Sequence, residues 1–231
     1  MIVLGIFAVS DIHGCYDEYI KLLDKINFSD TDTLYVLGDI CDRGDKPVEV
    51  YKDLMRRKNV HVIMRNHDYM LLQSIVSLLY GMENNSVSAW TDNGGKTTIE
   101  GILRLSNDEI AELIEYISSF SKYECLTIQD KKYVLVHSIP YDFKEDKPLD
   151  EYEIDDFLWE RPDYAKQYFR YENTFFVTGH TPTRCIRKDG KDEIFKGNGH
   201  IAIDCGCVYG GNLCAYCFET GEAVYLKSVH R

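Results

Sequence analysis

The stretch that decides the fold is Tyr35-Val36-Leu37-Gly38-Asp39-Ile40-Cys41-Asp42-Arg43-Gly44. It begins as a short apolar run and, after Gly38, carries two carboxylates and an arginine. This pattern is typical of a buried strand that delivers charged groups to the loop at its carboxyl end, where open α/β sheets bind ligands. Asp39 and Asp42 would repel each other at close range unless a positive group lies between them. Either Arg43 or a metal ion can provide that charge.

Two other apolar runs end in the same kinds of residue. Residues 2–9 lead into Asp11 and His13, and residues 60–63 lead into Asn66 and His67. Positions 11, 39 and 66 are therefore separated by 28 and 27 residues, which is typical of successive βαβ units of about 30 residues. Three neighbouring parallel strands would then end at one edge of a sheet. Oxygen ligands with imidazoles suit Mn, Fe or Zn, and several such loops that converge indicate two ions.

Two later histidines also follow apolar runs. His137 comes directly after residues 133–136, and His180 comes after residues 175–179. A lone histidine at a strand end is usually a hydrogen-bonded structural residue. Two of them at matching places, after the Asp/His loops, indicate metal ligands.

Taken together, these blocks resemble the calcineurin-like metallophosphoesterases, most closely the small bacterial and bacteriophage phosphoprotein phosphatases. The family pattern is Asp-x-His-Gly, Gly-Asp-x-x-Asp-Arg-Gly, Gly-Asn-His-(Asp/Glu) and two later histidines, and all five blocks occur here in order from Asp11 to His180. The stretch 203–211 is equally similar to the symmetrical diadenosine tetraphosphatases. Two positions depart from the pattern, because Ser10 and Arg65 each replace a usual glycine. Arg65 could be a third arginine that binds phosphate or a solvated charge, and we expect the latter.

The resemblance implies an α/β (α+β) fold in which two packed mixed β-sheets are flanked by helices, the four-layer metallophosphoesterase sandwich. It also implies two divalent metal ions, with Mn as the expected metal and Fe and Zn as alternatives. On this basis, Asp11, His13 and Asp39 hold the first ion, and Asp39, Asn66, His137 and His180 hold the second. A carboxylate shared in this way keeps two ions about 3.5–4 Å apart, so that they hold one phosphate from both sides.

The catalytic roles follow from the same resemblance. His67 is expected to be the general acid that protonates the leaving oxygen, oriented by Asp42, because an imidazolium near two dications needs a carboxylate. Arg43 and Arg161 are expected to bind the substrate phosphate together with Asn66, since a guanidinium contacts two phosphate oxygens in one plane. No serine or cysteine nucleophile is required, because a hydroxide that bridges both ions attacks phosphorus in line.

Composition limits the classes of partner. The formal net charge is −12, which disfavours binding to extended nucleic acid. No apolar run approaches the roughly 18 residues of a membrane span, and the first residues lack a basic leader and a cleavage site. We therefore expect a cytoplasmic protein that does not bind membranes. The eight cysteines are then expected to be free thiols, and buried thiols are favoured over a zinc site among Cys205, Cys207, Cys214 and Cys217.

The chain reads as one domain, residues 1–231, with two unusual segments. Helical patterns cover residues 17–26, 47–58 and 67–80, and a helical insertion is expected at about 81–121, broken at residues 93–95 within a Trp-x-x-Asn-Gly-Gly signature of the bacterial branch. A hairpin is predicted at 123–136. An acidic loop segment follows at about 138–163, with ten acidic against three basic residues. Short strands are predicted at 174–178, 184–187, 192–195, 200–203, 212–217 and 223–227.

The predicted activity is hydrolysis of phosphomonoesters by a Ser/Thr protein phosphatase. Its substrates would be phosphorylated proteins or peptides, and the acidic segment would favour basic phosphopeptides. The alternative is symmetrical cleavage of dinucleoside tetraphosphates, which makes the partner a small phosphoester or nucleotide. An RNA end phosphatase and a non-catalytic metal-bearing scaffold are less favoured, because the chain is acidic and because a scaffold has no need of the general acid His67.

Overall fold

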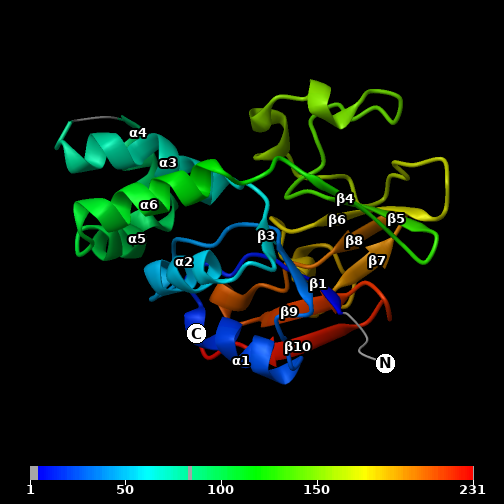
Figure 1. The fold of residues 1–231 in the computed structure, drawn as a ribbon. Coiled ribbons are helices and arrows are strands. Elements are labelled where there is room, and N and C mark those ends of the chain that lie inside the picture. The colour runs from blue at the N-terminus through cyan, green and yellow to red at the C-terminus, as the bar shows by residue number, and fades with distance from the viewer. Residues whose placement is uncertain (1–4, 83–84, 231) are drawn as a thin grey trace.

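The computed structural model, which describes residues 5–82 and 85–230, contains two five-stranded mixed sheets with helices beside them (Figure 1). The first sheet has the order β10-β9-β1-β2-β3, formed by β1 (Ile6–Val9), β2 (Thr33–Val36), β3 (Val60–Val62), β9 (Asn212–Cys217) and β10 (Ala223–Lys227). The second has the order β4-β5-β6-β8-β7, formed by β4 (Glu124–Ile128), β5 (Lys131–Leu135), β6 (Thr174–Thr178), β7 (Phe195–Gly197) and β8 (His200–Ala202). The predicted α/β architecture of two packed mixed sheets is confirmed.

The parallel strands β1, β2 and β3 place three loops at one edge of the first sheet. Val9 lies opposite Val36, and Val36 lies opposite Val62, so the strands end in line. Helix α1 (Tyr16–Lys25) connects β1 to β2, and α2 (Pro47–Arg56) connects β2 to β3. Pro47 suits the first turn of α2, where its missing N–H removes no helical hydrogen bond. Residues 2–4 of the predicted first strand lie outside the described residues.

The segment expected as a helical insertion follows α3 (Asn66–Leu79). It contains α4 (Asn85–Trp90), a π-helical turn (Thr91–Gly95), α5 (Lys96–Ile102) and α6 (Asn107–Ser118), which lie with α3 to one side of the sheets in Figure 1. Residues 83 and 84 of this segment lie outside the described residues. The expected break at residues 93–95 is a kink between two helices, where Gly94 adopts non-helical angles, with φ of 103°. Ser106 caps α6 through a reciprocal capping box with Glu109.

The strand-rich half differs from prediction in two places. Residues 184–187 were predicted as a strand but form a 3-10 turn (Thr183–Cys185), because the N–H groups of Ile186 and Arg187 bond back to the carbonyl of Thr183 (2.9 and 2.8 Å). The strand predicted at 192–195 begins only at Phe195.

The hairpin has a tighter turn than expected, since Gln129 and Asp130 both have positive φ (50° and 65°), as a two-residue type I′ turn requires.

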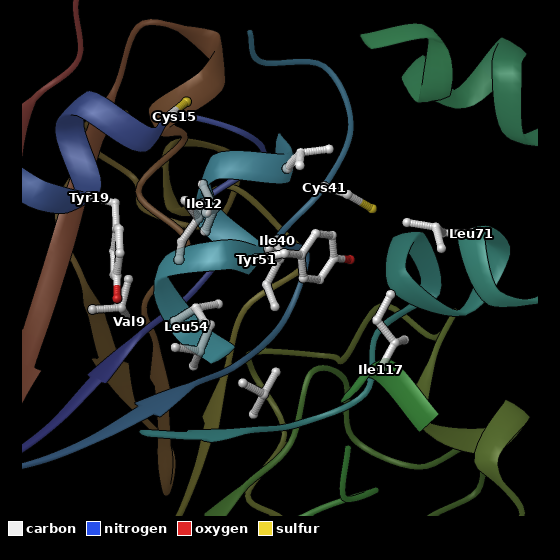
Figure 2. Close-up of a cluster of buried hydrophobic side chains, with 14 of the residues drawn as sticks. Val9, Ile12, Cys15, Tyr19, Ile40, Cys41, Tyr51, Leu54, Leu71 and Ile117 are labelled. Atoms are coloured by element: carbon white, nitrogen blue, oxygen red, sulfur yellow. The ribbon is translucent and has the colours of Figure 1, made fainter. Parts of the chain in front are cut away.

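The core has separate apolar clusters on each side of the sheets. One cluster packs the first sheet against the helices, and Figure 2 shows its side chains, including Val9, Tyr19, Tyr51, Leu71 and Ile117. A second joins both sheets through residues such as Leu37, Tyr133 and Val177. A third covers the outer face of the second sheet with Tyr152, Phe157 and Phe169. The outer covering of that sheet is therefore the acidic segment 138–163, which has two short 3-10 turns, Leu149–Glu151 and Ile154–Phe157, in place of α-helices.

Two further expectations concern thiols and membranes. Cys214 is buried and its thiol donates to the carbonyl of Ile203 (3.1 Å), whereas Cys217 is only partly buried. All eight cysteines are free thiols, as expected for this chain. Within the described ranges, no helix has the length and apolar character needed to cross a bilayer.

Candidate active site

The loops that leave the strand ends carry an unusual backbone. Six non-glycine residues of the site have positive φ: Asp11 (53°), His13 (44°), Asp39 (49°), Asp42 (72°), Arg43 (69°) and His180 (69°). Such angles are uncommon for residues with a side chain and persist where the surrounding structure holds them. Here the loops are tied by backbone bonds from the His13 N–H to the carbonyl of Asp39 (2.8 Å) and from the Gly44 N–H to the carbonyl of His13 (3.0 Å).

A cavity of about 430 Å³ opens at these loops. Eight residues predicted for the site line it: Asp11, His13, Asp39, Arg43, Asn66, His67, Arg161 and His180. The other two predicted residues, Asp42 and His137, are fully buried behind this surface. The structure therefore brings together side chains that are up to 169 positions apart, as between Asp11 and His180.

Two groups of potential metal ligands meet at Asp39. His13, Asp39 and His67 form one group, and Asp39, His137 and His180 form the other, with the ligand atoms of each group within 4.8 Å of one another. The Asp39 Oδ2 atom lies 3.6 Å from His13 Nε2 and 3.7 Å from His137 Nε2. Asn66 Oδ1 lies 2.8 Å from His137 Nε2. Asp39 therefore has the position of a shared ligand.

Asp11 also lines the cavity. It is absent from both groups in the described chain, where His67 completes the first one. Instead, its carboxylate oxygens accept the backbone N–H of His180 at 3.1 and 3.2 Å. The Ser10 hydroxyl also donates to Asp11, so the departure from glycine at position 10 adds a hydrogen bond to a predicted ligand.

The electrostatics of the site fit divalent cations. Burial, and next the charge of Asp39, raises the pKa of both Asp11 and Asp68 to about 7. His137 Nδ1 is buried and has no hydrogen-bond partner in the described part of the chain. Crowded buried carboxylates beside imidazoles are stabilised by a bound cation, and this mixed O and N donor set suits Mn, Fe or Zn. The residues present therefore fit divalent metal ions.

His67 and Asp42 form a buried pair next to the cavity. His67 Nδ1 lies 2.6 Å from Asp42 Oδ2, and the other ring nitrogen, Nε2, lies 2.8 Å from Arg43 Nη2. Burial tends to lower the pKa of His67, but Asp39 and the bond to Asp42 raise it above its ordinary value. This is the arrangement expected of an imidazole that holds a proton for transfer.

The kinked helical segment supplies two donors to Asp42 that sequence reasoning missed. Trp90 Nε1 donates to both carboxylate oxygens (2.9 and 3.0 Å), and the Thr98 hydroxyl donates to Oδ1 (2.7 Å). All three side chains are fully buried. The Trp-x-x-Asn-Gly-Gly signature contains Trp90, but nothing in the sequence indicates that Trp90 contacts Asp42.

Both arginines predicted to bind phosphate reach the cavity. The backbone N–H of Arg43 donates to the carbonyl of Gly94 (2.9 Å), and the Arg43 side-chain atom Nη2 lies 2.8 Å from His67 Nε2. Arg161 lies near the end of the acidic segment, and its Nη1 donates to Thr181 Oγ1 (3.2 Å). The two guanidinium groups therefore come from separate parts of the chain.

Asp68 is a third residue whose role the sequence did not reveal. Its carboxylate accepts the backbone N–H groups of Asp39 (3.0 Å) and Ile40 (3.3 Å) and the hydroxyl of Tyr51 (2.5 Å). It lies just after Asn66 and His67 in the chain. Asp68 therefore holds the backbone of the loop that carries the shared ligand Asp39.

The expectation that Arg65 is a solvated charge is wrong. Arg65 is fully buried, its Nε donates to the carbonyl of Leu37, and burial lowers its pKa to about 9. Its side chain packs where a Cβ at Gly38 would lie, 1.4 Å from the Arg65 Cγ. The absence of a side chain at Gly38 thus leaves room for the arginine between β2 and β3.

Removing the indole donor tests the support of Asp42. Trp90→Phe is expected to lower kcat with little change in metal content, because the Asp42 carboxylate loses a donor while no metal ligand changes. The lost buried hydrogen bond should also lower the free energy of unfolding by about 1–3 kcal/mol. Urea unfolding, metal analysis and kcat check these effects. Thr98→Val, which removes another donor to Asp42, should act in the same direction; normal kcat in both variants would contradict the proposed support.

Comparisons with known proteins agree with this geometry. A profile of the family described as calcineurin-like phosphoesterase matches residues 4–210. A symmetrical bis(5'-nucleosyl)-tetraphosphatase of Neisseria gonorrhoeae is 46% identical over 68 residues, which are 29% of this chain and only 25% of that relative. An asymmetrical bis(5'-nucleosyl)-tetraphosphatase of Halalkalibacterium halodurans is 26% identical over 95% of this chain and 92% of its own length.

A solved structure shows the same fold over the whole chain. The crystal structure of a candidate diadenosine tetraphosphatase superposes with a TM-score of 0.69 at 20% identity, covering 98% of this chain and 95% of the other. The resemblance seen in the sequence motifs is confirmed by the profile match, which extends over most of the chain. The chain belongs to the calcineurin-like phosphoesterase family.

Proposed function

We propose that this protein is a metal-dependent hydrolase of dinucleoside tetraphosphates. The observation that carries the proposal is the cavity of about 430 Å³ that holds the Asp39-centred ligand groups together with two arginines from separate segments. Arg43 and Arg161 both line this cavity, and each guanidinium can contact two phosphate oxygens. Relatives named for cleavage of bis(5'-nucleosyl) tetraphosphates support the same substrate class.

The predicted site residues have three roles in this reaction: binding phosphate, holding metal ions and donating a proton. Arg43 and Arg161 bind phosphate oxygens, and Asn66 adds a neutral polar contact that does not repel the anion. Two divalent ions would be held by the ligands predicted from the sequence, which are Asp11, His13, Asp39, Asn66, His137 and His180. Such ions would polarise a phosphoryl group and lower the pKa of water. His67, held by Asp42, directs Nε2 to the leaving oxygen and donates a proton to it.

Ser/Thr phosphoprotein hydrolysis, the main prediction from sequence, is the second candidate. The acidic segment 138–163 favours it, because this segment ends next to the cavity with Arg161 and carries ten acidic against three basic residues. However, none of its acidic side chains lines the cavity in the described part of the chain. The field of the segment therefore acts on substrates only from outside the site, and salt screens it.

A direct comparison of substrates tests the proposal. Mn-loaded protein is assayed with diadenosine tetraphosphate, a basic phosphopeptide and an acidic phosphopeptide in parallel, and the nucleotide products are separated. We expect the highest kcat/KM for diadenosine tetraphosphate, loss of activity with a chelator, and recovery when Mn is added back. Two molecules of ADP indicate symmetrical cleavage, whereas AMP with ATP indicates asymmetrical cleavage. A higher kcat/KM for the basic phosphopeptide would replace the proposal with the second candidate.

A further inference from the structure

We infer that Trp159 and Tyr209 form stacking surfaces for the nucleobases of the substrate. This inference rests on the proposed hydrolysis of dinucleotides and adds a base-binding subsite to it. Both side chains line the cavity that holds the Asp39-centred ligand groups. Both are also about half exposed, at 51% for Trp159 and 52% for Tyr209. Large aromatic rings held open to solvent beside a polar cavity are typical of ligand contacts.

The backbone that carries Trp159 is anchored. The two preceding residues, Phe157 and Leu158, are fully buried, and Phe157 stacks on Tyr123 with 6.0 Å between the ring centroids. On the other side, the carbonyl of Glu160 accepts the Ser138 hydroxyl next to His137. The backbone on both sides of Trp159 is therefore fixed, so that little backbone conformational entropy is lost when a ligand stacks on the indole.

Tyr209 is anchored in a comparable way. It ends a 3-10 turn, Cys207–Tyr209, that is bracketed by Gly206 and Gly210, both in the left-handed region with φ of 69° and 77°. The Tyr209 N–H donates to the carbonyl of Gly206 (3.0 Å), and the Tyr209 carbonyl accepts Arg184 Nη2 (3.4 Å). Cys207 at the start of the turn is buried, so only the phenol ring extends into the cavity.

Each aromatic ring has a phosphate-binding arginine nearby. The guanidinium carbon of Arg43 lies 5.6 Å from the centroid of the Tyr209 ring. Trp159 precedes Arg161 by two residues, and both line the cavity. A nucleotide joins a flat base to a phosphate chain, so a ring next to a guanidinium matches its two ends. Stacking of this kind needs no hydrogen-bond pattern, because every base has a π-face.

Kinetics with and without a base test the inference. Trp159→Ala and Tyr209→Ala are each expected to raise KM for diadenosine tetraphosphate about 5- to 100-fold, the range that loss of one stacked base causes, with kcat nearly unchanged. KM for inorganic tripolyphosphate should not change, since it has no base. Trp159→Phe and Tyr209→Phe should keep most of the affinity. Tyr171→Ala is the matched control, because Tyr171 is exposed (71%) and does not line the cavity.

Fluorescence gives a readout without turnover. The chain has two tryptophans, and Trp90 is fully buried, so Trp159 is the one open to a ligand. AMP should quench the emission of metal-free protein, ribose 5-phosphate should not, and Trp159→Phe should abolish the quenching.

The outcomes separate the two proposals. If diadenosine tetraphosphate is hydrolysed, but AMP does not quench and both alanine variants keep the parent KM, the stacking inference is wrong and the proposed function stands. An equal loss on diadenosine tetraphosphate and tripolyphosphate would also overturn it, because that result indicates a structural role. If AMP quenches Trp159 but diadenosine tetraphosphate is not hydrolysed, base stacking holds and the proposed function is wrong.

Discussion

Asp39→Asn is expected to lower turnover by about 10³-fold or more, the rate equivalent of several kcal/mol of metal-based stabilisation. The physical reason is the central position of Asp39, whose Oδ2 lies within 3.7 Å of one imidazole in each ligand group. An amide at this position removes the shared charge, so both ions should bind more weakly. Metal content, measured on purified protein and by titration, should therefore fall at both sites together.

The same variant has a second effect, on stability. The charge of Asp39 adds to the raised pKa of Asp11 and of Asp68, after burial itself. Burial also opposes the charge of Asp39, but the nearby His67, His13, His180 and Arg43 lower its pKa below the ordinary value. The ionised carboxylate is therefore net stabilising, and we expect metal-free Asp39→Asn to be less stable than the metal-free parent in thermal unfolding at neutral pH. Asp17→Asn is the control, since Asp17 pairs with Lys46 on the surface. Parent-like metal content and rate in Asp39→Asn would rule out a shared ligand.

His67→Asn is expected to lower turnover of alkyl phosphomonoesters by about 10²–10⁴-fold, the usual contribution of a general acid. The loss should be much smaller for nitrophenyl phosphate, because its leaving group hardly needs a proton. A plot of the loss against the pKa of the leaving group measures this dependence. An equal loss for all leaving groups would contradict the role of proton donor.

Metal analysis of the same variant decides between two roles for His67. Its ring lies in the first ligand group with His13 and Asp39, yet its Nδ1 is held by Asp42. If His67 is a general acid and not a ligand, the metal content of His67→Asn should not change. If His67 is a ligand, the variant should lose one ion. His61→Asn is the matched control, because His61 is exposed on β3 and stacks on Tyr35 outside the cavity.

The sequence predicted which loops meet at one sheet edge where the local pattern marks the end of a strand. An apolar run followed by Asp, Asn or His marks a strand end, and parallel strands that end in line bring such residues together. For this reason the loops of Asp11, Asp39 and Asn66 were located without any knowledge of their distances. The strand predicted at 184–187 was wrong and the strand predicted at 192–195 was shifted, because each segment has only two apolar residues and such short segments also suit turns with local hydrogen bonds.

By itself, the sequence determined the fold class, the loops that carry the ligand-type residues and the family, because these depend on residue types at fixed offsets from strand ends. Only the tertiary structure decided which side chains support them. Trp90 reaches Asp42, Tyr51 reaches Asp68, and Arg65 lies buried over Gly38. The tertiary structure also placed Trp159 and Tyr209 at one cavity. Such contacts join residues that are distant in the chain and carry no chemical signature, so they depend on how helices and loops pack over the sheet edge.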